Sequence, residues 1–226
     1  MNKNISIIGI NDSFAGQVIN FLQKKIKDKI NCIIYDKVQK KKTNSIINNK
    51  IEIKNKNKIF GLKFFKVNSY TKFLKEKKIE KVFLLIENNK EREKIFNLIK
   101  KQVKILSFVH PNVFLSGKNK IGDGSIIFPG CYLAYKANVG VSTIIQSNCK
   151  IEHHNEIGDF CDINPNLTTG GFTQIENNCT INMSVNIINR IKISKNCQIG
   201  AGSLVLKNTV NNHLYYGVPA KKNKLI

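Results

Sequence analysis

The hydrophobic pattern of the second half of the chain repeats every six residues from residue 115 to residue 210. An aliphatic side chain opens every hexad except the one at Thr169; the opening positions are 115, 121, 127, 133, 139, 145, 151, 157, 163, 169, 175, 181, 187, 193, 199 and 205. Neither an α-helix nor a hairpin sheet has a period of six, so the pattern predicts a solenoid. Three hexads would form one triangular turn of about 18 residues, and the whole run predicts roughly five turns stacked at about 4.8 Å.

A second line of mostly small residues follows the first line by four positions. It contains five of the six cysteines, namely Cys131, Cys149, Cys161, Cys179 and Cys197. Because the chain has no C-x-x-C pair, we interpret all six cysteines as small buried hydrophobes rather than metal ligands or disulfide partners. Reduced thiols, without a signal peptide or a membrane span, predict a cytoplasmic protein with no stable membrane insertion.

The N-terminal part of the chain, 1–107, alternates between strand and helix patterns. Strands are expected over 5–10, 32–35 and 81–86, and helices over 14–26, 70–78 and 91–101. The lysine- and asparagine-rich segment 37–58 is expected to be a loop with a strand or two. This alternation predicts a small parallel sheet of the doubly wound, Rossmann-like type. We therefore expect an α/β domain over 1–107, followed over 108–226 by an all-β solenoid domain.

Ligands of doubly wound sheets bind at the carboxyl ends of the strands, which here lie near Gly9–Ser13, Asp36 and Glu87–Asn89. The segment from Gly9 to Gly16 does not read G-x-G-x-x-G, which disfavours a nicotinamide-dependent dehydrogenase. A phosphate can still bind at the start of the helix that follows. A plain strand-to-helix turn explains this segment equally well.

The formal net charge is +22 with a pI near 9.8, and the excess is nearly all lysine. Arginine, which binds phosphate through two parallel hydrogen bonds, occurs only at Arg92 and Arg190. Without an aromatic-interleaved basic motif, we interpret the charge as solvated surface rather than a nucleic-acid interface. A basic surface would still attract anionic substrates.

Several motifs occur in an order that resembles one known family. They are Ile7-Ile8-Gly9, Tyr35-Asp36, Asn88-Asn89-Lys90-Glu91-Arg92, Val109-His110-Pro111, Ile151-Glu152-His153, Glu156-Ile157-Gly158-Asp159-Phe160 and Gly217-Val218-Pro219-Ala220-Lys221. With the hexads, they resemble the bacterial sugar acetyltransferases with a left-handed parallel β-helix, which include sialic acid O-acetyltransferases and N-acetyltransferases of nucleotide-linked aminosugars. The resemblance covers nearly the whole chain.

This resemblance implies a homotrimer that binds acetyl-CoA between neighbouring prisms. It implies acetyl transfer to an amino or hydroxyl group of a nucleotide-linked or free sugar in surface-glycan biosynthesis. N-acetylation of a nucleotide-linked 4-aminosugar is our first interpretation, and sialic-acid-type O-acetylation is the second. A catalytically silent nucleotide-sugar-binding protein is the alternative from another class.

The family's general base corresponds to His153. The residue is third in its hexad, so it should not fill the interior, and an imidazole can take a proton near neutral pH. The catalytic candidates are His153, His154 and Glu152. His154 stands where the family usually has an acidic residue. Glu152 and Glu156 are the candidates to supply the missing carboxylate. His153 and His154 are expected to point to opposite faces, which disfavours a shared metal ion as in the zinc carbonic anhydrases of this fold. No metal is therefore expected.

The remaining candidates follow from the resemblance. Those for acetyl-CoA are Asp162, which replaces a family histidine near the thioester, Gly171, Met183, Ala201, Pro219 and Lys221. Those for the sugar substrate are Gly9, Asn11, Asp12, Ser13, Asp36, Lys37 and Gln146, of which Gln146 matches a family asparagine. Thr169 precedes Gly170-Gly171, where the arm of acetyl-CoA is expected to pass.

Overall fold

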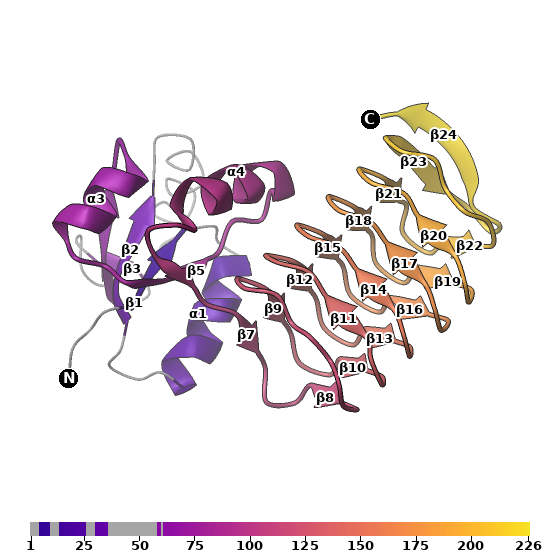
Figure 1. Ribbon diagram of the computed structural model, residues 1–226, viewed down its shortest axis with the longest axis horizontal. Coiled ribbons are helices and arrows are strands. Elements are labelled where there is room, and N and C mark those ends of the chain that lie inside the picture. The colour runs from indigo at the N-terminus through magenta and orange to yellow at the C-terminus, as the bar shows by residue number, and fades with distance from the viewer. Residues whose placement is uncertain (1–4, 10–13, 26–29, 36–57, 60) are drawn as a thin grey trace. The chain divides into compact units, whose positions relative to one another are not determined.

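The computed structural model describes residues 5–9, 14–25, 30–35, 58–59 and 61–226. The chain divides into two compact units, Met1–Leu106 and Ser107–Ile226 (Figure 1). None of the helices in the described part of the chain has the length and hydrophobicity needed to cross a lipid bilayer.

The N-terminal unit is a six-stranded sheet with helices. Its strands lie in the order β3-β4-β2-β1-β5-β6, all parallel to their neighbours except for the antiparallel β3–β4 pair. The elements are β1 (Ile5–Ile8), α1 (Phe14–Lys25), β2 (Ile30–Tyr35), β3 (Lys58–Ile59), β4 (Leu62–Lys66), α3 (Tyr70–Glu76), β5 (Lys81–Leu84), α4 (Asn89–Ile99) and β6 (Lys104–Ile105). The sequence did not predict β4 and β6, because neither shows a buried apolar run: β4 is half-exposed or exposed throughout, and β6 has two residues. Of the segment 37–58, which was expected to be a loop with a strand or two, residues 37–57 lie outside the described residues and Lys58 begins β3.

The strand order of this sheet reverses at β1, which has β2 on one side and β5 on the other. Gly9 directly follows β1 with a φ of +100°, and a Cβ there would lie 2.5 Å from the carbonyl oxygen of Leu85. Only glycine fits both constraints. Arg92 of α4 is fully buried, and its guanidinium donates to the carbonyls of Ile86 (2.9 Å) and Glu87 (2.8 Å). This contact fixes the carboxyl end of β5 against α4.

The C-terminal unit is a parallel β-helix, as the hexads predicted (Figure 1). Strands of successive coils pair in register at a separation of three hexads, as Leu133 does with Ile151. Face 1 consists of β8 (Phe114–Leu115), β10 (Tyr132–Leu133), β13 (Lys150–Ile151), β16 (Thr168–Thr169), β19 (Asn186–Ile187) and β22 (Leu204–Val205). Face 2 consists of β11 (Asn138–Val139), β14 (Glu156–Ile157), β17 (Gln174–Ile175) and β20 (Lys192–Ile193). Face 3 consists of β7 (Phe108–Val109), β9 (Ile126–Ile127), β12 (Ile144–Ile145), β15 (Asp162–Ile163), β18 (Thr180–Ile181), β21 (Gln198–Ile199), β23 (His213–Tyr216) and β24 (Lys221–Leu225).

Both predicted lines of the hexad face the interior of the coils. The first line is buried from Ile127 to Val205, whereas Leu115 in the first coil is exposed. All six cysteines are buried thiols rather than disulfide partners. The neighbouring thiols Cys131 and Cys161, together with burial, raise the pKa of Cys149 and Cys179 respectively, so these two thiols stay protonated. They serve as packing residues.

The corners of the coils have a feature that the hydrophobic pattern did not reveal. The fourth residue of every hexad from residue 118 to residue 202 has a positive φ. On two edges of the prism these residues are glycine, asparagine or serine, with Phe160 as the exception; on the edge between faces 1 and 2 they are Lys118, Lys136, His154, Phe172 and Arg190. The left-handed conformation costs a residue with a Cβ roughly 1–2 kcal/mol. Backbone strain is therefore concentrated along this edge, which we call the strained edge.

Ile181 tests whether interior packing stabilises the β-helix. It is fully buried, so Ile181→Ala should lower the free energy of unfolding by about 2–5 kcal/mol, measured by urea denaturation. Ile188→Ala, at a side chain that is 39% exposed, is the control and should cost less than about 1 kcal/mol. Equal losses in the two variants would contradict this account of the core.

Candidate active site

The strained edge brings His153 and His154 together. The chain leaves β13 at Ile151, turns through these two residues and enters β14 at Glu156. The φ of His154 is +58°, and the Nδ1 atoms of the two imidazoles lie 3.1 Å apart at hydrogen-bonding distance. The expectation that the two side chains point to opposite faces is wrong, because the corner is left-handed rather than extended.

A column of aromatic rings holds the imidazole of His154 on two sides. His154 stacks on Phe172, with ring centroids 4.8 Å apart and an interplanar angle of 12°. Tyr135 meets His154 edge-on at 5.8 Å. Tyr135 and Phe172 each lie about one coil from His154, because equivalent positions in successive coils are three hexads apart. The column therefore continues over three coils of the strained edge.

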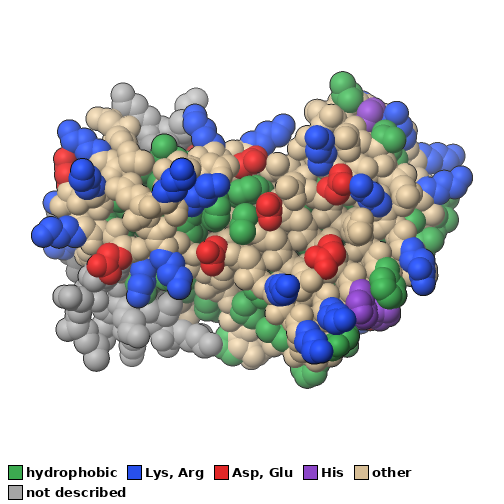
Figure 2. Space-filling view, in the orientation of Figure 1, with side chains coloured by type: hydrophobic (Ala, Val, Ile, Leu, Met, Phe, Trp, Pro, Cys, Tyr) green, Lys and Arg blue, Asp and Glu red, His purple; other side chains and the backbone are tan. Residues whose placement is uncertain are grey.

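Basic side chains close both ends of this column. Arg190 lies over the ring of Phe172 at 5.1 Å, and Lys118 and Lys136 lie 5.7 Å and 5.3 Å from the ring of Tyr135. A cation over an aromatic face contributes about 0.5–1 kcal/mol at an exposed site. Figure 2 shows histidine side chains on the β-helix next to lysine, arginine and hydrophobic side chains.

Gly171 provides the space for the imidazole of His153. A Cβ at Gly171 would lie 2.6 Å from Cε1 and 2.7 Å from Nε2 of His153. The Phe172 amide donates to the carbonyl of His153 at 3.0 Å, which joins the two coils at this corner. The side chain of His153 is exposed to solvent. Its ring therefore lies on the backbone of Gly171 with access from outside.

A buried polar pair lies beneath the same corner. Thr169 Oγ1 accepts hydrogen bonds from the amide of Glu152 (3.1 Å) and from Nδ2 of Asn155, whose Oδ1 accepts from the amide of Thr173 (2.6 Å). Thr169 and Asn155 are both almost completely buried. Thr169 is thus explained by a hydrogen-bond network inside the coil, which ties the histidine turn to the turn that contains Gly171.

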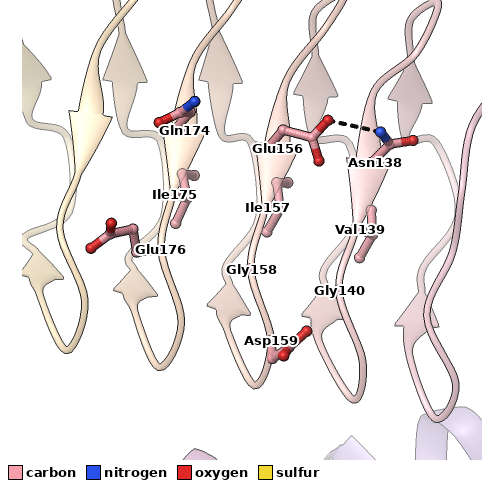
Figure 3. A pocket seen from close by; sticks show the side chains of 10 residues that line it. All are labelled: Asn138, Val139, Gly140, Glu156, Ile157, Gly158, Asp159, Gln174, Ile175 and Glu176. Carbon is pink, nitrogen blue, oxygen red and sulfur yellow. Dashed lines mark hydrogen bonds between the residues drawn. The ribbon is translucent and has the colours of Figure 1, made fainter.

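A groove of about 360 Å³ runs along face 2, and its strand β14 begins two residues after His154 (Figure 3). Its lining residues are Asn138, Val139, Gly140, Glu156, Ile157, Gly158, Asp159, Gln174, Ile175 and Glu176. Oε1 of Glu156 accepts a hydrogen bond from Nδ2 of Asn138 at 2.8 Å, and Figure 3 shows the two side chains reaching toward each other. Hydrogen bonds from Lys192 Nζ and the amide of Lys195 lower the pKa of Glu176. The groove was not predicted from the sequence.

Within the described part of the chain, neither imidazole pairs with a carboxylate. The carboxylate of Glu156 is bonded to Asn138, and Glu152 contacts this corner through its backbone amide. No group of three or more His, Cys, Asp or Glu side chains among the described residues is placed to hold a metal ion. At this corner, the exposed imidazole of His153 therefore contacts the imidazole of His154.

The remaining acetyl-CoA candidates lie elsewhere on the prism. Met183 and Ala201 occupy the edge between faces 3 and 1 in adjacent coils, where the amide of Gly202 donates to the carbonyl of Met183 at 2.9 Å. Asp162 begins β15 and Gln146 follows β12, both on face 3. Pro219 and Lys221 belong to the C-terminal hairpin of β23 and β24. A single chain therefore brings His153, His154 and Gly171 together and leaves the others on a different edge or face.

Of the sugar candidates in the N-terminal unit, Gly9 lies at the carboxyl end of β1, where the strand order reverses. The other five, Asn11, Asp12, Ser13, Asp36 and Lys37, lie outside the described residues.

Sequence reasoning missed Tyr135, Asn155, Phe172 and Arg190. A signal for Phe172 and Arg190 exists in the sequence, because the fourth hexad position is glycine, asparagine or serine at most corners. Every third hexad from residue 118 to residue 190 replaces these residues with lysine, histidine, phenylalanine or arginine. Strained backbone conformations cluster at functional sites, so this departure marks the strained edge as a candidate site.

Gly171→Ala tests the placement of His153. The new methyl group would overlap the imidazole, so we expect the ring to move and its Cε1–Hε1 NMR signal to shift. Overpacking of this kind should lower the free energy of unfolding by about 1–3 kcal/mol. Asn189→Ala, at the same position one coil further, should leave that signal in place. An unchanged His153 signal in Gly171→Ala would contradict the described packing.

No protein-family model and no curated protein sequence matches the chain. Solved structures do match. The structure of PerB from Caulobacter crescentus in complex with CoA and GDP-perosamine aligns over 98% of this chain and 97% of that chain, with a TM-score of 0.82 and 19% sequence identity. The acetyltransferase domain of PglB from Neisseria gonorrhoeae FA1090 in complex with acetyl coenzyme A aligns over 99% of this chain and 100% of that chain, with a TM-score of 0.73 and 17% identity.

A third match, WeeI from Acinetobacter baumannii AYE, has a TM-score of 0.55 at 18% identity over 97% of this chain and 99% of that chain. At these identities the matches establish architecture. The chain has the fold of the hexapeptide-repeat sugar N-acetyltransferases with a left-handed β-helix.

Proposed function

We propose that this protein transfers the acetyl group of acetyl-CoA to the amino group of a nucleotide-linked sugar, with a 4-aminosugar as the first choice. The observation that carries the proposal is the exposed imidazole of His153, seated on Gly171 at the strained edge. The matching structures of PerB, with CoA and GDP-perosamine, and of PglB, with acetyl coenzyme A, support the choice of substrates. The place of such a reaction is surface-glycan synthesis in the cytoplasm.

His153 is the general base of the proposed reaction. The amine nitrogen attacks the carbonyl carbon of the thioester, and Nε2 of His153 takes the proton that the nitrogen releases. When the tetrahedral intermediate collapses, the C–S bond breaks and the imidazolium returns this proton to the thiolate. The products are the N-acetylated sugar and CoA. A positioned base of this kind typically contributes about 10²–10⁴-fold to the rate.

Gly171 is suited to stabilise the oxyanion that forms on the thioester oxygen. Its amide donates to no other group within the described part of the chain, and the residue lies against the imidazole of His153. A backbone N–H is a fixed dipole that needs no reorganisation during the reaction. A side chain at this position would block both the imidazole and the acyl group.

The N-terminal unit is proposed to bind the nucleotide as a Rossmann-like domain. Ligands of open parallel sheets bind where the strand order reverses, and here Gly9 marks that point. The buried Arg92 holds the neighbouring end of β5 in place. The candidates Asn11, Asp12, Ser13, Asp36 and Lys37 follow β1 and β2 in the sequence, so they belong to this proposed site.

A homotrimer is proposed because the two groups of candidates occupy different edges of one prism. His153 and Gly171 lie on the strained edge, whereas Met183 and Ala201 lie on the edge between faces 3 and 1. A cyclic assembly places different edges of neighbouring copies against each other. Acetyl-CoA would then bind between two chains, with one chain supplying the base.

The activity is tested with acetyl-CoA and a panel of UDP-, GDP- and CMP-linked aminosugars, by following free thiol release and product mass. His153→Ala should lower kcat by about 10²–10⁴-fold with little change in KM for acetyl-CoA. If His153→Ala transfers the acetyl group as fast as the wild type does, His153 is not the base. A hydroxylamine-sensitive ester product would favour sialic-acid-type O-acetylation, and the absence of transfer would favour a silent binding protein.

A site shared between chains predicts complementation. His153→Ala removes the base from the strained edge, and Ala201→Trp should block the acetyl-CoA groove on the other edge. Each variant alone should be nearly inactive, whereas trimers co-expressed at equal amounts should regain about a quarter of wild-type sites, because each site needs one intact edge from each variant. No recovery in verified mixed trimers would show that the site lies within one chain.

A further inference from the structure

The second imidazole at the strained edge has a role that rests on the proposed function but is chemically distinct from it. We propose that His154 is a positioning residue that accepts a hydrogen bond from Nδ1–H of His153 and thereby leaves the lone pair of His153 on Nε2. An imidazole in this position takes the place of a carboxylate. The pair is competent only while both imidazoles are neutral, because a protonated His154 has no lone pair with which to accept.

The Nδ1–Nδ1 contact carries this inference. At 3.1 Å one nitrogen donates and the other accepts, so the two rings hold complementary tautomers. If His153 donates from Nδ1, its Nε2 is free to take a proton. If His154 donated instead, the neutral ring of His153 would carry its hydrogen on Nε2 and would not be a base there. Only the first arrangement fits general-base chemistry at the exposed ring.

The surroundings hold His154 in the accepting position. Phe172 stacks on one side of its ring and Tyr135 meets it from the coil on the other side. His154 also adopts a left-handed conformation at φ +58°, which brings its Nδ1 toward His153. An otherwise unfavourable backbone conformation is thus used to form one specific contact.

Basic side chains lie along the column that contains the pair. The titratable and charged groups along the column are His153, Tyr135, Lys118, Lys136 and Arg190. The two lysines lie over the ring of Tyr135, and Arg190 lies over the ring of Phe172. Neither imidazole has a carboxylate partner within the described residues. The nitrogen of His154 is therefore the acceptor that the described residues offer to Nδ1–H of His153.

Three substitutions at His154 separate the roles. His154→Asn keeps an acceptor at nearly the same place, does not titrate and suits the left-handed conformation. His154→Asp supplies a charged acceptor, and His154→Ala removes the acceptor. Asn196→Ala is the matched control for an alanine at a left-handed corner, because it lies on the edge between faces 2 and 3.

We expect kcat at pH 8 to fall at least about tenfold in His154→Ala, with KM unchanged, and to stay within about fivefold of wild type in His154→Asn. The acid limb of the kcat/KM profile should move up by about one pH unit in His154→Asp, because a carboxylate stabilises the imidazolium of the base. Asn196→Ala should show the wild-type profile. The proposal is overturned if His154→Asn is as slow as His154→Ala, or if His154→Asp leaves the acid limb in place.

A second readout does not depend on acetyl transfer. The chain has four histidines, so ¹⁵N-labelled imidazoles can be assigned from single variants. In the wild type at pH 8, His153 should carry its hydrogen on Nδ1, and it should lose this preference in His154→Ala and keep it in His154→Asn. An unchanged tautomer in His154→Ala overturns the pairing. If the tautomers are as expected but the protein transfers no acetyl group, the pairing is supported and the proposed function is refuted.

Discussion

The structure of the β-helix depends on one backbone constraint, a left-handed residue at the fourth position of each hexad. This residue turns the chain sharply between two short strands, so three hexads close one triangular coil. The aliphatic first line and the small second line then fill the interior. At most corners glycine, asparagine or serine lowers the cost of the turn.

The strained edge departs from this pattern, and the departure explains the site. Its corner residues are bulky or charged, and their side chains form, together with Tyr135, the column from Lys118 to Arg190. The left-handed turn brings His154 against His153, and the adjacent Gly171 makes room for the His153 ring. The Thr169–Asn155 network supports the same corner from inside. Several independent contacts thus converge on one exposed imidazole.

Much of this architecture could be predicted from the sequence, because a period of six has a single structural interpretation. His153 was placed correctly outside the interior by the phase of its hexad. Its contact with His154 was not, because adjacent residues on an extended strand point apart and the left-handed corner reverses that rule. Thr169 stood out as a polar interruption, but its partner Asn155 lies in the preceding coil and meets it only when the coils stack. Strand β4 contains Leu62, Phe64 and Phe65, but lysines interrupt them and no buried apolar run marks the strand.

The central claim is that the chemistry occurs at the strained edge on the imidazole of His153. The most direct test is a crystal structure of the protein with CoA and a nucleotide-linked aminosugar. The account predicts the sugar amine within about 2.6–3.2 Å of His153 Nε2, and the thiol of CoA beside Gly171. A ternary complex with the amine and thiol at another edge or face of the prism would contradict it.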